Sequence, residues 1–146
     1  MPRTRWSAGV VTRNSCVNRR SIEIHPTAEA HTYLGFAYRH QGRLEDAIAE
    51  CERAIEVDPA FGNPYNDIGA YLIELGSSED AIPWLEKSTH SERYESYQFP
   101  WYNLGRVYTA KEMYRKASEC FQNALDIEPE YEAAQKAFDR LRRSIQ

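Results

Sequence analysis

Apolar and small residues recur along this chain at the spacing of an α-helix. Leu34 and Gly35 are followed by Tyr38 three residues later, so these residues share one helix face. A second stripe, with spacings of four and three residues, consists of Ala47, Cys51 and Ala54. Gly42 stands between the stripes, where a residue with positive φ ends a helix. The pattern therefore predicts two amphipathic helices joined by a tight turn.

The same two-helix pattern occurs three times. Gly69 and Gly105 correspond to Gly35, and successive glycines are 34 and 36 residues apart. An alanine stands twelve residues after each glycine, as Ala47, Ala81 and Ala117. A period of roughly 20–50 residues is typical of repeat architectures. We therefore expect three helical pairs, each of which buries its apolar face against its neighbours.

The third unit shows the pattern most fully. It carries Trp101, Leu104, Gly105, Tyr108, Ala117, Phe121, Ala124 and Pro129. In these positions the chain resembles the tetratricopeptide repeat family, over residues 28–131 approximately. The resemblance implies an all-α fold, a right-handed superhelical stack of three antiparallel helix-turn-helix repeats whose first helices line a concave groove.

The chain divides into a basic arm and a repeat domain. We place the arm, disordered or extended, at residues 1–26 and the domain at residues 27–146. Within the domain we place repeats at about 28–61, 62–97 and 98–131 and a capping helix at about 131–145. Unit three has Glu112 where units one and two have Gly42 and Gly76, so we expect its turn to differ.

Charge is distributed unevenly between these two parts. Residues 1–22 hold five arginines and no acidic residue, a charge of +5, while the remaining residues sum to −9. An acidic body argues against a nucleic-acid partner, because phosphate contacts need a clustered basic face. The arm is similar to an organellar transit peptide in composition but lacks an amphipathic stripe. We therefore expect a cytoplasmic protein rather than an organellar one.

The sequence offers no catalytic or metal-binding pattern. Its four histidines stand beside no candidate nucleophile, and neither a metalloprotease motif nor a phosphate-binding glycine-rich loop occurs. The three cysteines are widely spaced and odd in number, which indicates neither a zinc site nor a disulfide framework. No run approaches the ~18 apolar residues of a membrane-spanning helix. We expect a protein with no enzymatic activity, cofactor or membrane span.

The expected function is protein–protein interaction, as a scaffold that binds a peptide or protein segment in the concave groove. The alternatives are a structural protein that self-associates and a regulatory docking module for an enzyme acting in trans. The groove-facing residues should come from the three first helices: Thr32, Tyr33, Phe36, Arg39, Asn63, Asn66, Asp67, Ala70, Ile73, Phe99, Tyr102, Asn103 and Arg106. We expect the asparagine amides to bond the peptide backbone and the aromatic rings to provide apolar contact.

One class of partner is disfavoured by the residue types in this groove. Members of the family that hold the acidic C-terminal tails of chaperones use a clamp of Lys, Arg and Asn. The clamp slots fall here on Thr32, Phe36, Asp67, Phe99 and Asn103. None of these is basic, and Asp67 would repel a carboxylate. We therefore expect a basic or neutral partner segment.

An insertion of two residues separates units two and three, near 91–97. Its neighbourhood is rich in aromatic residues, and the position of the usual proline is taken by Arg93. Two hypotheses remain open for Tyr94 and Tyr97. They either pack on the junction between repeats or form an interface patch for a partner, since aromatic residues are enriched at binding hot spots.

Overall fold

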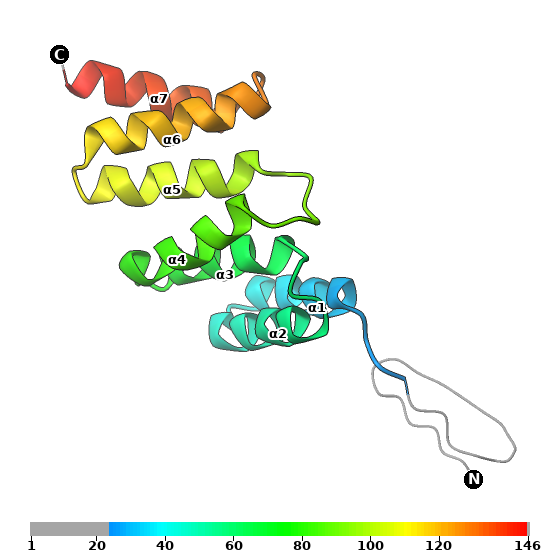
Figure 1. The fold of residues 1–146 in the computed structure, drawn as a ribbon. Coiled ribbons are helices and arrows are strands. Elements are labelled where there is room, and N and C mark those ends of the chain that lie inside the picture. Colours follow the sequence, from blue (N-terminus) through cyan, green and yellow to red (C-terminus); the bar gives the residue numbers. More distant parts are fainter. Residues whose placement is uncertain (1–23, 146) are drawn as a thin grey trace, which may run out of the picture.

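The helical spacing of the sequence is realised as a stack of helices. A computed structural model describes residues 24–145, which contain α1 (Ala28–His40), α2 (Leu44–Val57), α3 (Asn63–Glu74), α4 (Ser78–Thr89), α5 (Gln98–Ala110), α6 (Tyr114–Ile127) and α7 (Glu132–Ser144). The helices follow one another along one axis (Figure 1). The expected all-α repeat stack is therefore confirmed. The basic arm lies almost entirely outside the described residues.

Each repeat is an antiparallel pair that packs on the pair beside it. The pairs are α1 with α2, α3 with α4, and α5 with α6, and each second helix also contacts the first helix of the next repeat. The helix α7 closes the stack by packing on α6. Within residues 24–145, no helix is long and apolar enough to cross a membrane.

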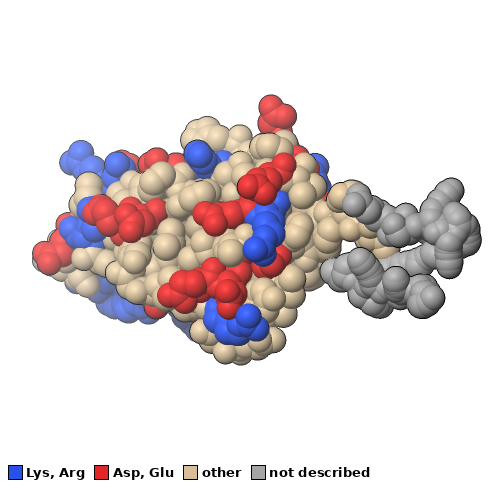
Figure 2. All heavy atoms as spheres, turned by 90° about the horizontal axis from the view of Figure 1, so that it is seen from below, with Lys and Arg blue, Asp and Glu red and all other residues tan. Residues whose placement is uncertain are grey.

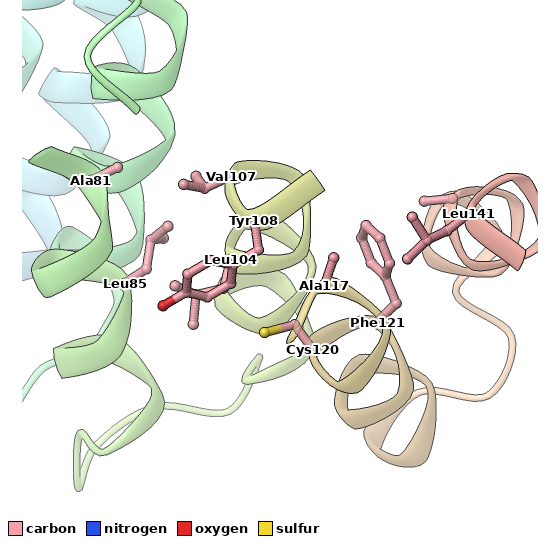
Figure 3. Packing of buried hydrophobic residues seen from close by; sticks show 10 residues of the cluster. Ala81, Leu85, Leu104, Val107, Tyr108, Ala117, Cys120, Phe121 and Leu141 are labelled. Carbon is pink, nitrogen blue, oxygen red and sulfur yellow. The ribbon is translucent and has the colours of Figure 1, made fainter. Parts of the chain in front are cut away.

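The buried apolar residues form several clusters along the stack. The largest extends from α4 to α7 and includes Leu85, Leu104, Phe121 and Leu141 (Figure 3). A second cluster joins α2 to α3. The hydrophobic core is thus a series of interfaces between neighbouring helices, as the repeat pattern predicts.

Glycine on the first helix of each repeat permits close approach of the second. A Cβ atom added at Gly69 would overlap the side chain of Leu85, and one at Gly105 would overlap the ring of Phe121. At Gly35 the same atom would lie 3.0 Å from the carbonyl oxygen of Ala47. Glycine costs about 1 kcal/mol against alanine within a helix, and here it provides the space that the partner side chain fills.

The first end of the stack lacks a neighbour. Leu34 is 40% exposed, whereas the corresponding Ile68 and Leu104 are 1% and 2% exposed. The latter two are covered by the second helix of the preceding repeat, and no described element covers α1 in this way. Figure 2 views the molecule from this end and shows acidic and basic side chains interspersed around uncharged surface.

The turn of unit three corrects our expectation from the sequence. Glu112 adopts a φ of 60°, close to the 77° and 84° of Gly42 and Gly76. Its N–H donates to the carbonyl of Thr109, and the N–H of Met113 donates to that of Tyr108, both at 2.9 Å. The equivalent bonds follow α1 and α3. The turn is therefore the same in all three repeats, because packing of the helix pair imposes it on a residue that disfavours it.

The inserted segment between α4 and α5 is held against the preceding junction by Arg93. Its N–H donates to the carbonyl of Ala60, and its own carbonyl accepts from Gly62, both at 3.0 Å. The guanidinium group lies 4.2 Å from the centre of the Phe61 ring. It also pairs with Asp58 at 2.8 Å and with Glu29 at 3.0 Å. Because arginine replaces the usual proline here, this position has an N–H group and a charged side chain. They connect the inserted segment to the loop before α3, to Asp58 at the end of α2, and to Glu29 on α1.

The variant Gly69→Leu should be strongly destabilised. Overpacking of a filled helix junction costs about 1–3 kcal/mol, and here the new side chain must displace Leu85. Chemical denaturation followed by circular dichroism measures the change. The control Ala37→Leu adds the same side chain at an exposed position of α1 and should alter stability little. Equal stability of the two variants would contradict the helix packing described here.

The variant Glu112→Gly should be more stable than the wild type by about 0.5–1 kcal/mol, because glycine adopts a positive φ without the steric cost of a Cβ atom. The opposite change at the matched turn, Gly42→Ala, should destabilise the protein. Thermal and urea denaturation of both variants test this pair. A Glu112→Gly protein less stable than the wild type would show that the side chain of Glu112 contributes more than its backbone costs.

Candidate binding surface on the first helices

The first helices of the repeats face one another across one side of the stack. The helix α3 contacts both α1 and α5, whereas the second helices make no comparable contact with one another in the described part of the chain. Two polar contacts mark this side, one between Arg39 and Glu74 and the other between Asn66 and Asn103. We call the side formed by α1, α3 and α5 the inner surface. The residues predicted to face the groove belong to these three helices.

Exposed aromatic side chains lie on this inner surface. Phe36 precedes Arg39 by three residues and Phe99 precedes Asn103 by four, so each shares a helix face with a residue that marks the inner side. Phe36 is 51% exposed, Phe99 is 41% exposed, and Tyr33, one turn before Phe36, is 76% exposed. These three side chains are therefore exposed to solvent.

An ion pair links α1 to α3. The guanidinium of Arg39 donates to one carboxylate oxygen of Glu74, from Nε at 3.0 Å and from a terminal nitrogen at 2.5 Å. This carboxylate raises the pKa of Arg39. The hydroxyl of Thr32 donates to the carbonyl of Ala28 at 2.8 Å, so only its oxygen remains to accept a hydrogen bond. Arg39 and Thr32 are thus already engaged within the protein.

The two asparagines are engaged with each other, which changes the role we expected for them. Asn66 and Asn103 are only 8% and 7% exposed. The amide nitrogen of Asn103 donates to the amide oxygen of Asn66 at 3.0 Å, and the oxygen of Asn103 accepts from Arg106 at the same distance. Their amides therefore join α3 to α5 rather than standing free for a peptide backbone.

Asp67 lies next to this chain of hydrogen bonds. The amide of Asn66 bonds its carboxylate and favours ionisation, but burial has the larger effect and raises the pKa of Asp67 to about 7. Among the ion pairs of the described residues, none includes Asp67. The inner surface thus contains a desolvated carboxyl group with no cationic partner.

The remaining predicted residues are partly buried in the protein itself. Tyr102 packs between the rings of Tyr131 and Phe121, with centroid distances of 5.2 and 5.9 Å. Ile73 packs on the largest apolar cluster and Ala70 on the second. Asn63 is the first residue of α3 and is half-buried. These side chains shape the inner surface but expose less of themselves than Tyr33 or Phe36.

Tyr94 and Tyr97 lie at the junction between repeats two and three. Tyr94 packs over Gly62, where an added Cβ atom would be 2.7 Å from its side chain, and burial raises its pKa. Tyr97 donates its hydroxyl hydrogen to the carbonyl of Ser91 at 2.5 Å. The rings contact each other edge to face, with centroids 5.2 Å apart. This packing favours the first hypothesis for these residues, that they fill the junction.

Sequence reasoning missed one buried charged contact. Glu50 is 6% exposed and pairs with His31 at 2.8 Å and with Arg53. His31 occupies the position of a large apolar residue, and the nineteen-residue separation from Glu50 gave no local signal. In the described residues, no group of three or more His, Cys, Asp or Glu side chains is arranged to hold a metal ion.

Comparison with known proteins identifies relatives for most of the chain. The family model described as tetratricopeptide repeat matches residues 28–61 and 100–131. The human tetratricopeptide repeat protein 29 is 33% identical over 109 residues, which cover 68% of this chain and 23% of that protein. The Arabidopsis thaliana protein NPGR2 is 26% identical over 78% of this chain and 16% of its own length. The chain thus spans less than a quarter of these relatives.

A solved structure shares the fold at low sequence identity. The first tetratricopeptide domain of Spaghetti (RPAP3), bound to the HSP90 peptide SRMEEVD, aligns with a TM-score of 0.74 at 17% identity. The alignment covers 81% of this chain and 92% of that one.

Proposed function

Because the chain belongs to the tetratricopeptide repeat family, we propose that it is a non-catalytic scaffold that binds a segment of another protein along its inner surface. The stacked first helices present an extended surface with side chains from every repeat. The Spaghetti domain, which shares this fold, is bound to a peptide. That likeness supports peptide binding as the function, and the residues that carry it must come from this chain.

The observation that supports this site most directly is the exposure of Tyr33, Phe36 and Phe99 on one side of the stack. Large aromatic side chains dominate the energetics of protein interfaces, since they bury much apolar area with few rotatable bonds. The ring of Phe36 lies edge-on to His40, with centroids 4.3 Å apart, which orients it. An extended segment would bury these rings on binding.

We further propose that the bound segment is basic or neutral. The HSP90 peptide of the Spaghetti complex contains two adjacent glutamates and a final aspartate, so that complex does not support this preference. The support is local to this chain. Among residues 24–145 Asp67 forms no ion pair, and Arg39 is paired with Glu74. A carboxylate of a ligand would therefore be repelled by Asp67, and the basic group left for it on this surface would be Arg106, which is bonded to the amide oxygen of Asn103.

Self-association is the second candidate function, because Leu34 at the uncovered end of the stack is 40% exposed. A second copy could cover this residue as the preceding repeats cover Ile68 and Leu104.

A docking module for an enzyme acting in trans would use the same inner surface as the scaffold. For each of these roles we propose a cytoplasmic location, because the reducing conditions there suit the buried free thiols of Cys51 and Cys120.

The double variant Phe36→Ala/Phe99→Ala should lose binding to the inner surface. Peptides would first be selected from a random displayed library on the wild-type protein, and their affinities measured by fluorescence anisotropy. Loss of two buried rings should weaken binding at least about tenfold. The control Ile127→Ala, on the second helix α6 and 44% exposed, should bind normally. Failure to select any peptide, or equal binding by both variants, would contradict the proposed site.

A further inference from the structure

We infer that Asp67 determines the specificity of the inner surface by pairing with a lysine or arginine side chain of the bound segment. This inference rests on the proposed function, since it names the chemistry that the inner surface selects. Three features of the described residues support it: the partners of the other acidic groups, the surroundings of Asp67, and the contacts of the nearby arginines.

Other poorly exposed carboxylates of the repeats have cationic partners. The buried Glu50 pairs with Arg53 and also bonds His31, and the partly buried Asp58 pairs with Arg93. The amide of Asn66 favours the ionised form of Asp67, and none of the ion pairs of residues 24–145 includes Asp67. A charged hydrogen-bond donor strongly stabilises a desolvated carboxylate, because few water molecules compete with that donor. Within the three described repeats, Asp67 is thus a poorly exposed carboxylate without a basic partner.

The nearest cations of the inner surface are held in other contacts. Arg39 is bound to Glu74, and Arg106 donates to the amide oxygen of Asn103. Arg106 donates to Asn103 and Asn103 donates to Asn66, while the amide of Asn66 lowers the pKa of the neighbouring Asp67 against the larger effect of burial. This polarised chain favours the ionised carboxylate and fixes its position. Asp67 is therefore prepared for a cation that the domain does not itself supply.

Several titratable groups interact with Asp67 and therefore affect how its charge changes with pH. They are Cys51 on α2, Tyr71 on α3 and Tyr94 in the segment after α4, and Tyr71 interacts in turn with Arg39 on α1 and Glu74 on α3. Burial, and to a smaller extent the charge of Asp67, raises the pKa of Cys51, Tyr71 and Tyr94, so these groups stay neutral while Asp67 ionises. Arg39 and Glu74 are paired with each other. Asp67 is therefore the group here whose charge changes near neutral pH.

A lysine or arginine side chain also suits the apolar part of the surface. The helix α1, which contacts α3, presents the exposed rings of Tyr33 and Phe36. Long basic side chains cover apolar surface with their methylene groups while the charged end reaches a polar partner. A ligand that offers such a side chain would use both the aromatic rings and the carboxylate.

The first experiment selects peptides from a random displayed library on the wild type and on Asp67→Asn, which removes the charge but keeps the shape. The wild type should enrich peptides with a lysine or arginine at one position, and Asp67→Asn should enrich peptides without that preference. The control Glu119→Gln makes the same change of charge at an exposed position of α6 and should retain the preference. Melting curves verify that each variant is folded.

The second experiment titrates a selected lysine peptide and its glutamine analogue against both proteins. Loss of one charged hydrogen bond should weaken the lysine peptide about tenfold or more on Asp67→Asn and leave the analogue unchanged. Because the cation favours the ionised carboxyl group, wild-type affinity for the lysine peptide should rise between about pH 6 and 8. The affinity of Asp67→Asn should not change in that range.

The outcomes separate this inference from the proposed function. Selected peptides with no basic preference, or a lysine peptide bound equally by the wild type and Asp67→Asn, would overturn the role of Asp67 and leave the binding surface intact. Enrichment of acidic peptides on the wild type would also overturn the role of Asp67 and leave the binding surface intact. If neither protein selects a peptide, the proposed function and this inference both fail.

Discussion

The close approach of two helices over a glycine is the constraint on which this structure depends. Leu85 and Phe121 occupy the space that a Cβ atom would fill at Gly69 and Gly105, and this contact fixes the distance between the helices of a pair. The pair then presents one face to the next repeat, so stacking follows from the same contact. Because each repeat is stabilised by its neighbours, the molecule has several apolar clusters rather than one centre.

This arrangement leaves surface features at defined places. Leu34 is exposed because the first repeat has no predecessor in the described chain, while the first helices meet along the inner surface. There the buried amides of Asn66 and Asn103 join adjacent repeats, and the aromatic rings and Asp67 are the groups that we propose to bind a ligand. The residues that hold the stack together and those proposed to bind a partner therefore lie side by side on the same helices.

The sequence was sufficient to predict the fold because the repeat period and the small-residue positions are local patterns. It was not sufficient for contacts between repeats. Glu112 adopts the turn conformation of a glycine because the packed helices impose it, and no local pattern reveals that force. The asparagine pair depends on a separation of 37 residues, the contact of Arg93 with Asp58 on one of 35, and its contact with Glu29 joins residues still further apart in the sequence. The exposed aromatic residues were predictable from helix register alone.

Native-state hydrogen exchange tests most directly the claim that stability comes from contacts between neighbouring repeats. The amides of α3 to α6, each packed between helices, should exchange slowly, and those of α1 and α7 at the ends of the stack should open at lower free energy. Graded protection that falls toward both ends would agree with this account. Equal protection of all seven helices in a single cooperative unit would contradict it.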